Sequence, residues 1–182
     1  DEEPPSYGLN SKLIKKGGIL TEDRWTTESL YAPAIRQIVY WLNKAKDYAE
    51  NKHQIKVIDL LIKYYRTGDL RVFNTYSIEW LKEKEGNVDF VNGFIEVYGD
   101  PLGIKGSWEG IVEFKDLEAT KRTNIISSNA QWFEDHSPVD RRFKKQIVRG
   151  VTANVVCAAM LGGDEYPSSA IGINLPNADW IR

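Results

Sequence analysis

The sequence has few of the side chains that cross-link a fold or bind transition metals. It contains one cysteine, one methionine and two histidines in 182 residues. The single cysteine, Cys157, excludes an internal disulfide, and its apolar neighbours predict an inert thiol in the core. The two histidines, His53 and His136, fall on different predicted elements and lack the spacing of a metal-binding helix. We therefore expect no metal ligand in this chain.

The sequence also lacks a long apolar run and a strong charge of either sign. No apolar stretch reaches the roughly 18 residues that a membrane-spanning helix needs. Twenty-four basic against 26 acidic residues give a net charge of −2, so neither a membrane nor a nucleic acid is expected as a partner. The chain starts at Asp1 and stops soon after a motif, so we expect both ends to be cut. We expect a cytoplasmic protein, and export of the parent stays open.

The first half of the sequence predicts helices. Residues 1–24 are rich in proline, glycine and charge, which predicts an extended lead-in with weak regular structure. Apolar residues at three- and four-residue spacing predict helices over residues 33–50, 53–66 and 70–85. Short links between amphipathic helices are typical of antiparallel neighbours. Residues 25–86 thus form the helical part of a single domain that continues to residue 182.

Residues 87–182 predict a mixture of strands and helices. Residues 89–98 divide into two alternating sets, the period-2 pattern of a strand. A Gly/Pro-rich turn follows, residues 108–114 form a second run, and together they predict a β-hairpin. We then expect a helix at 116–133, a segment at 151–161 that is either a strand buried on both faces or a helix, and a strand at 170–175. The fold class is α+β, with antiparallel helices followed by a small, mostly antiparallel sheet.

The predicted hairpin gathers two carboxylates and a phenol, from Glu96, Glu109 and Tyr98. An acid among aromatic residues is costly to bury without a partner, although a solvated or salt-bridged glutamate is also common. The two acids fit a glycoside hydrolase, in which tryptophans serve as sugar platforms. The candidate platforms are Trp80, Trp108 and Trp132.

A non-catalytic peptide-binding module is a further interpretation of the same residues. Such a module would use Asn174 and Asn177, whose spacing around Pro176 suits ligand binding but also suits an Asx turn without any ligand.

Two motifs carry a resemblance to a known family. The sequence FIEVYGDPLG at residues 94–103, followed by GSWEG at 106–110, and the sequence IGINLPN at 171–177 are similar to segments of the dipeptidyl peptidase III family. Those enzymes are zinc exopeptidases that remove dipeptides from peptide N-termini. The resemblance implies a two-lobed parent, in which the strands of this chain belong to a β-barrel beside the substrate.

The resemblance also implies what this chain leaves to the rest of its parent. The zinc motif of the family, His-Glu-x-x-Gly-His, and a further glutamate ligand would follow Arg182. This chain would then lack the zinc ligands and be inactive alone. Its expected partners are a short peptide substrate and the remaining lobe of the same polypeptide.

The same resemblance implies roles for individual residues. Glu96, Asn174 and Asn177 match the residues that bind the amino end of the peptide, where a carboxylate and amide carbonyls suit a free ammonium group. Tyr98 matches a tyrosine that hydrogen-bonds the scissile carbonyl as it becomes an oxyanion. Glu109 matches a second glutamate near these subsites. The stretch Ile171-Gly172-Ile173 matches an edge strand that pairs with the substrate backbone, where Gly172 permits close approach.

Overall fold

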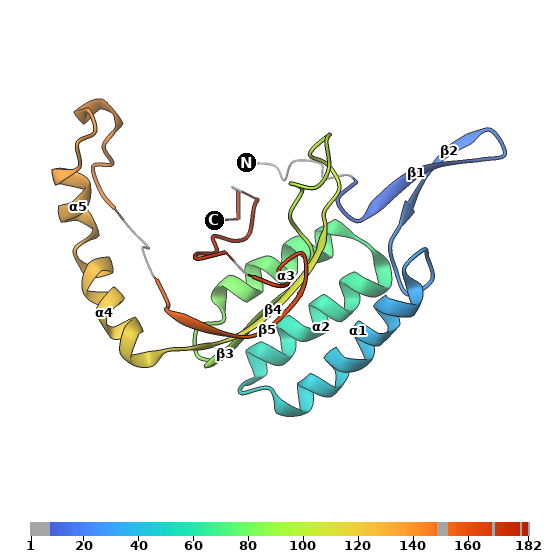
Figure 1. Cartoon of the computed structure of the whole chain (residues 1–182), viewed down its shortest axis with the longest axis horizontal. Helices are drawn as coiled ribbons and strands as arrows, with labels where there is room; N and C mark the ends of the chain where they lie inside the picture. The colour runs from blue at the N-terminus through green and yellow to red at the C-terminus, as the bar shows by residue number, and fades with distance from the viewer. Residues whose placement is uncertain (1–7, 149–152, 169, 179, 182) are drawn as a thin grey trace.

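The computed structural model of the chain describes residues 8–148, 153–168, 170–178 and 180–181. Three helices, α1 (Ala32–Ala45), α2 (Lys52–Thr67) and α3 (Leu70–Lys82), come first and pack side by side (Figure 1). The side chain of Asn51 caps α2 by accepting a hydrogen bond from Gln54 N, and Asp69 caps α3 in the same way through Arg71 N. The three predicted helices are therefore confirmed, within a few residues at each end. A short 3₁₀ turn, η1 (Lys46–Tyr48), follows α1.

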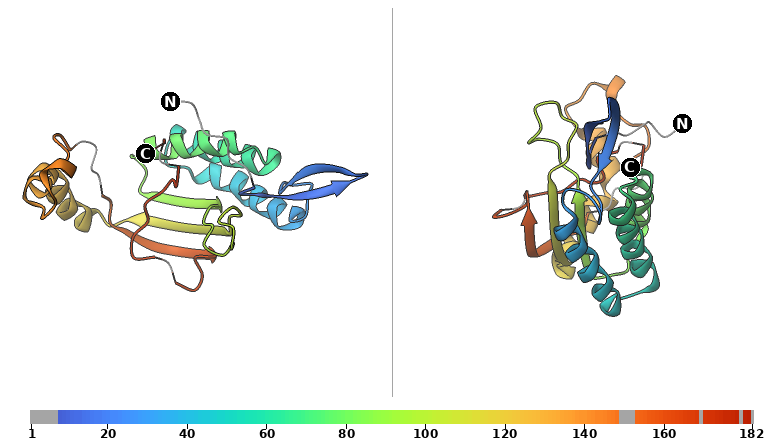
Figure 2. Two further views of the ribbon diagram at one scale, coloured as in Figure 1. Left: turned by 90° about the horizontal axis from the view of Figure 1, so that it is seen from above. Right: turned by 90° about the vertical axis from the view of Figure 1, so that its right-hand side faces the viewer.

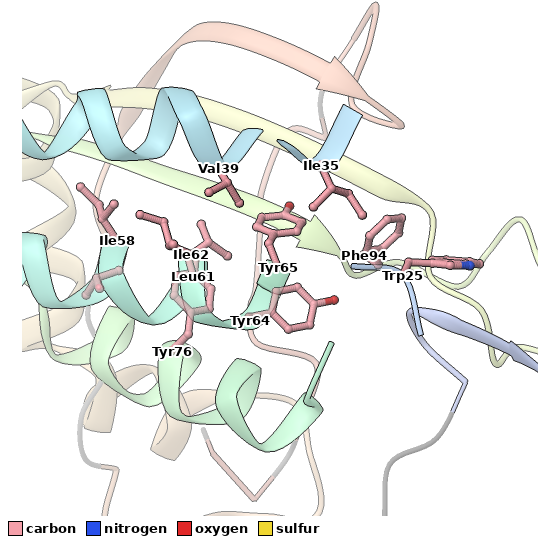
Figure 3. Packing of buried hydrophobic residues seen from close by; sticks show 11 residues of the cluster. Trp25, Ile35, Val39, Ile58, Leu61, Ile62, Tyr64, Tyr65, Tyr76 and Phe94 are labelled. Atoms are coloured by element: carbon pink, nitrogen blue, oxygen red, sulfur yellow. The ribbon is translucent and has the colours of Figure 1, made fainter. Parts of the chain in front are cut away.

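The main core lies between these helices and the first strand of a sheet (Figure 3). It combines aliphatic side chains of α1 and α2 with buried tyrosines. Tyr64 and Tyr65 of α2 and Tyr76 of α3 are almost fully removed from solvent. Phe94, at the end of the first sheet strand, packs against Trp25 with ring centroids 4.8 Å apart. This packing holds the end of β3 in place, next to the hairpin loop that carries part of the candidate site.

The larger sheet has three antiparallel strands in the order β3 (Val88–Phe94), β4 (Trp108–Lys115) and β5 (Val156–Gly163). β3 lies nearest the helices and β5 furthest from them (Figure 2). Val91 and Ile111 are buried on one face, where Leu161 of β5 and Leu175 from the C-terminal segment pack against them. The α+β fold class, with helices before a small antiparallel sheet, is confirmed, while the closed barrel stays a prediction.

The expectation of weak regular structure in residues 1–24 is wrong for residues 11–24. β1 (Ser11–Lys16) and β2 (Ile19–Arg24) form an antiparallel hairpin whose turn is Gly17-Gly18. Both glycines have positive φ, 56° and 86°, which is the conformation that a two-residue hairpin turn requires. Two of the glycines behind the expectation of weak regular structure are the turn of this hairpin.

The predicted helix at 116–133 is two helices, α4 (Leu117–Ser128) and α5 (Ala130–His136). Asn129 separates them, after the run of β-branched and serine residues in which helix propensity is weak. A 3₁₀ turn, η2 (Arg141–Phe143), follows. None of the residues in α4, α5 and η2 is buried. These elements form an arm that stands away from the three N-terminal helices (Figure 1).

Two further strand predictions need correction. The segment at 151–161, predicted as a strand buried on both faces or as a helix, contains a strand, but β5 starts at Val156 and is mostly exposed, Cys157 included. β5 pairs with β4 alone in the described residues, so its other edge and much of its surface face solvent. Residues 151 and 152 lie outside the described residues. Residues 170–175 form no strand; Leu175 reaches the sheet through its side chain, next to Pro176, which has no N–H for strand pairing. Within the described residues, no helix is long and apolar enough to cross a membrane.

Candidate functional site

The candidate site lies where the β3–β4 hairpin ends. β3 stops at Phe94, earlier than the predicted strand, yet backbone pairing continues for two residues. Ile95 N donates to Ser107 O at 3.1 Å, and Ser107 N donates to Glu96 O at 2.7 Å. The backbone of Glu96 is therefore held by the hairpin, while residues 97–106 form a loop beyond it.

Asp100 organises that loop. Its carboxylate accepts backbone hydrogen bonds from Lys105 N at 2.8 Å, Ile104 N at 3.0 Å and Leu102 N at 3.4 Å. These backbone donors, Lys105 N first among them, hold the pKa of Asp100 below its usual range. The loop is thus folded around one carboxylate, and it carries Tyr98.

The C-terminal segment reaches the same place. Asn177 Nδ2 donates a hydrogen bond to Glu96 Oε1 at 3.1 Å, across 81 residues of sequence. Asn177 also lines an apolar pocket of about 260 Å³, together with Trp80 of α3 and Ile95 and Val97 of the hairpin. The structure therefore brings two of the three residues that the resemblance assigns to amine binding into direct contact, beside an apolar pocket.

Glu109 lies next to Glu96 but inside the protein. Its exposed fraction is 3%. Burial, then the carboxyl of Glu165 and then the charge of Glu96, raise the pKa of Glu109 to about 8, so it is mainly protonated at neutral pH. Because the folded state holds this proton more tightly than the unfolded chain, Glu109 stabilises the fold most below its ordinary pKa. That contribution is lost as pH rises towards 8.

The other predicted site residues lie on the surface. Tyr98 is 89% exposed, and Ile171, Gly172 and Asn174 are exposed as well. A Cβ built on Gly172 would meet no atom within 4 Å, so its backbone is open to a neighbouring chain. Within the described residues, the side chains of Tyr98 and Asn174 make no hydrogen bond to Glu96. Their roles stay predictions.

The three candidate sugar-platform tryptophans do not lie where a glycoside hydrolase would need them. Trp80 Nε1 donates to Asp89 Oδ1 at 2.8 Å, and Trp108 Nε1 donates to Tyr65 Oη at 2.9 Å. Both rings are therefore tied into the interior, and Trp132 lies on α5 in the arm. This arrangement does not resemble a row of open platforms beside two acids.

Sequence reasoning missed two features of the site. Tyr65 Oη accepts from Trp108 and donates to Asn92 Oδ1, which joins α2 to both strands of the hairpin. Glu165, to which sequence reasoning assigned no role, lies close enough to Glu109 to raise the pKa of that carboxyl. Only the position of Glu165 had a signal in the sequence, and it was weak. Glu165 follows the apolar run of β5, which pairs with β4.

The described residues contain no group of three or more His, Cys, Asp or Glu side chains placed to hold a metal ion. His53 Nε2 lies 3.1 Å from Glu79 Oε2, a carboxylate that Lys56 and Lys82 also contact. Two lysines at one carboxylate make an ion-pair cluster, and they would repel a cation. The residues that the structure describes therefore do not fit a zinc site.

Known proteins resemble this chain over most of its length. The model of peptidase family M49 matches residues 16–182. Dipeptidyl peptidase 3 of Homo sapiens is 29% identical over 156 residues, and that of Rattus norvegicus 28%; each match covers 86% of this chain and 21% of the relative. The structure of DPP III from Caldithrix abyssi superimposes with a TM-score of 0.83 at 20% identity, covering 96% of this chain and 33% of that one. The chain thus spans about a fifth of the length of its curated relatives.

The loop around Asp100 gives a first test. In Asp100→Ala the N–H groups of Ile104 and Lys105 lose their acceptor, so their hydrogen exchange should become at least about tenfold faster. Asp100→Asn, which keeps one oxygen acceptor, should give a smaller change, and exposed Asp47→Ala none in this loop. Equal exchange rates in wild type and Asp100→Ala would mean that the carboxylate does not hold the loop.

Proposed function

The chain belongs to peptidase family M49, and from this membership we propose that it is the substrate-binding part of a larger dipeptidyl peptidase. Such an enzyme removes dipeptides from the N-termini of peptides. The matched relatives named dipeptidyl peptidase 3 support the activity of the parent, and their greater length supports a parent in which this chain is one part. Membership of a peptidase family leaves the glycoside hydrolase hypothesis without support.

The contact between Asn177 and Glu96 carries the proposal. It places residues from both family motifs at one point, with a carboxylate and an amide side by side. Asn177 uses its Nδ2 for Glu96, so its carbonyl oxygen stays available as an acceptor. A carboxylate and an amide carbonyl together suit a peptide ammonium group, and each charged hydrogen bond contributes about 1.5–3 kcal/mol.

The neighbouring residues support the rest of a peptide site. Asn174 lies three residues before Asn177 and would supply a second amide. The exposed backbone of Ile171 and Gly172 would pair with the extended substrate. Tyr98, on the loop that Asp100 folds, would donate its phenol to the carbonyl that becomes an oxyanion. Glu109 lies beside Glu96 as a further acid of the same site.

The zinc ion of such a peptidase would be held by residues outside this chain, because the described residues offer no ligand set. We therefore propose that the 182-residue chain has no peptidase activity alone. The unburied arm of α4 and α5 and the exposed strand β5 support packing against the remaining polypeptide of the parent. Apolar side chains such as Ile126, Phe133 and Met160 are open to solvent there.

Glu96→Gln tests the amine site in the full-length polypeptide that contains this chain. The substitution keeps the size of the side chain but removes the charge. KM for a peptide with a free amino group should rise about 10- to 100-fold, the equivalent of ~1.5–3 kcal/mol, because a charged hydrogen bond is lost. KM for the N-acetylated peptide should change little. Steady-state kinetics on the paired substrates measures both values.

Glu118→Gln is the matched control, because Glu118 lies exposed on α4 and pairs only with Lys121 among the described residues. It should leave both KM values unchanged. An equal rise in KM for free and acetylated peptides in Glu96→Gln would exclude Glu96 from amine binding.

Tyr98→Phe separates substrate binding from transition-state stabilisation. Loss of the phenolic O–H should lower kcat by about 100-fold, as loss of an oxyanion donor does, with little change in KM. The ring is exposed in this chain, so its replacement should not disturb folding. A raised KM with unchanged kcat would assign Tyr98 to ground-state binding instead.

A further inference from the structure

Two carboxyl groups, those of Glu109 and Glu165, lie beside the proposed amine site, and peptide binding as proposed gives no role to Glu165. Glu109 near the start of β4 pairs with Gly163 at the end of β5, and Glu165 follows two residues later. Asp164 N donates to Trp108 O at 3.0 Å, which ties this turn to β4. Gly163 has a φ of 63°, and an added Cβ would lie 2.1 Å from Trp108 O, so glycine permits the turn to approach this closely.

Each of the two carboxyl groups has one buried oxygen that receives no hydrogen bond from the described residues. Within the described residues, Glu109 Oε1 and Glu165 Oε2 have no hydrogen-bond donor. The Glu165 carboxyl lies close enough to act on Glu109, and after burial it is the largest cause that raises the pKa of Glu109. An ionised carboxylate only accepts hydrogen bonds, so a carboxyl–carboxyl hydrogen bond requires a proton between the groups.

We propose that Glu109 and Glu165 share one proton in the ligand-free protein and release it to solvent when the amino group of a peptide binds beside Glu96. The nature of the ligand rests on the proposed function. The proton leaves for solvent, and the ammonium group takes over its role of balancing the negative charge. Glu165 is then a positioning residue that acts through Glu109.

The charges around the pair favour this exchange. Glu165 and Glu96, the two titratable groups that act on Glu109 in the described part of the chain, are both acidic. The backbone of Glu96 acts in the opposite direction and lowers the pKa of Glu109. Burial, the first cause, raises the pKa of Glu109 to about 8, so the pair keeps its proton in the empty site. An ammonium group beside Glu96 lowers the cost of a second negative charge.

The proposed exchange predicts how the affinity for the amine changes with pH. Below the pKa of the pair, binding must expel a proton, so affinity for the amine rises with pH, by up to about tenfold per pH unit. A peptide amino group ionises near pH 7.7–8.0, so it stays charged between about pH 5.5 and 7 and adds no trend of its own there. Proton release in that range therefore comes from the protein.

Calorimetry in buffers of different ionisation enthalpy counts these protons. The protein is the full-length polypeptide that contains this chain, and the ligand is a free-amine tetrapeptide with a reduced second peptide bond, compared with its N-acetylated form. Wild type should release close to one proton per free-amine peptide at pH 6.5. Glu109→Gln should release none, and Glu165→Gln should release clearly less, because Glu109 then ionises at lower pH. Asp164→Asn removes a neighbouring charge and should match wild type.

The outcomes separate this inference from the proposed function. If wild type prefers the free-amine peptide but releases no proton, the shared proton is excluded and amine binding stands; this holds even if a variant fails to fold. Proton release in Glu165→Gln equal to that of wild type would exclude Glu165 from the pair. Equal binding of free and acetylated peptides would contradict the proposed function itself, and with it the ligand assigned here.

Discussion

The hydrogen bond from Asn177 to Glu96 is the contact on which the candidate site depends. It joins a hairpin in the middle of the chain to a segment near its end, and neither segment alone has the groups that an ammonium ion needs. The amide N–H of Asn177 orients the Glu96 carboxylate, and within the described residues no donor is recorded for the amide oxygen, which can accept a hydrogen bond. The carboxyl pair of Glu109 and Glu165 and the loop that carries Tyr98 both lie on the hairpin side of this contact or next to it.

The contact is useful because its hairpin side is rigidly held. The buried tyrosines of α2 and α3 pack against Phe94 at the end of β3, and Tyr65 bonds both Trp108 of β4 and Asn92 of β3. A binding residue held by such packing loses little further entropy when a ligand arrives. The arm of α4 and α5, by contrast, is not held by packing, because it has apolar side chains but no buried residue. That contrast fits a chain that completes its fold against other parts of a larger protein.

Local rules predicted the helices well and the later strands poorly. Apolar spacing and the caps at Asn51 and Asp69 are properties of neighbouring residues, so the sequence reveals them. The exposure of β5 depends on which strand pairs with its outer edge, and the sequence of one strand does not contain that information. The hairpin at residues 11–24 is missed because a stretch rich in proline, glycine and charge predicts weak regular structure, although paired glycines such as Gly17-Gly18 are also a turn signal.

The site shows the same division. Glu96 and Asn177 belong to motifs, so a resemblance could identify them, and the structure then brought them together. The contact of Glu165 with Glu109 depends on strand register and on a close approach at Gly163. No motif marks such a pairing. Its consequence, a carboxyl that stays protonated at neutral pH, arises from burial, which appears only in three dimensions.

The most direct test is an experimental structure of the full-length polypeptide with a bound free-amine peptide. The amino nitrogen should lie within about 3 Å of both the Glu96 carboxylate and the Asn177 side-chain oxygen. A peptide whose amino end lies away from both residues, with the contact between Asn177 and Glu96 undisturbed, would contradict the assignment of this chain as the amine-binding part of the enzyme.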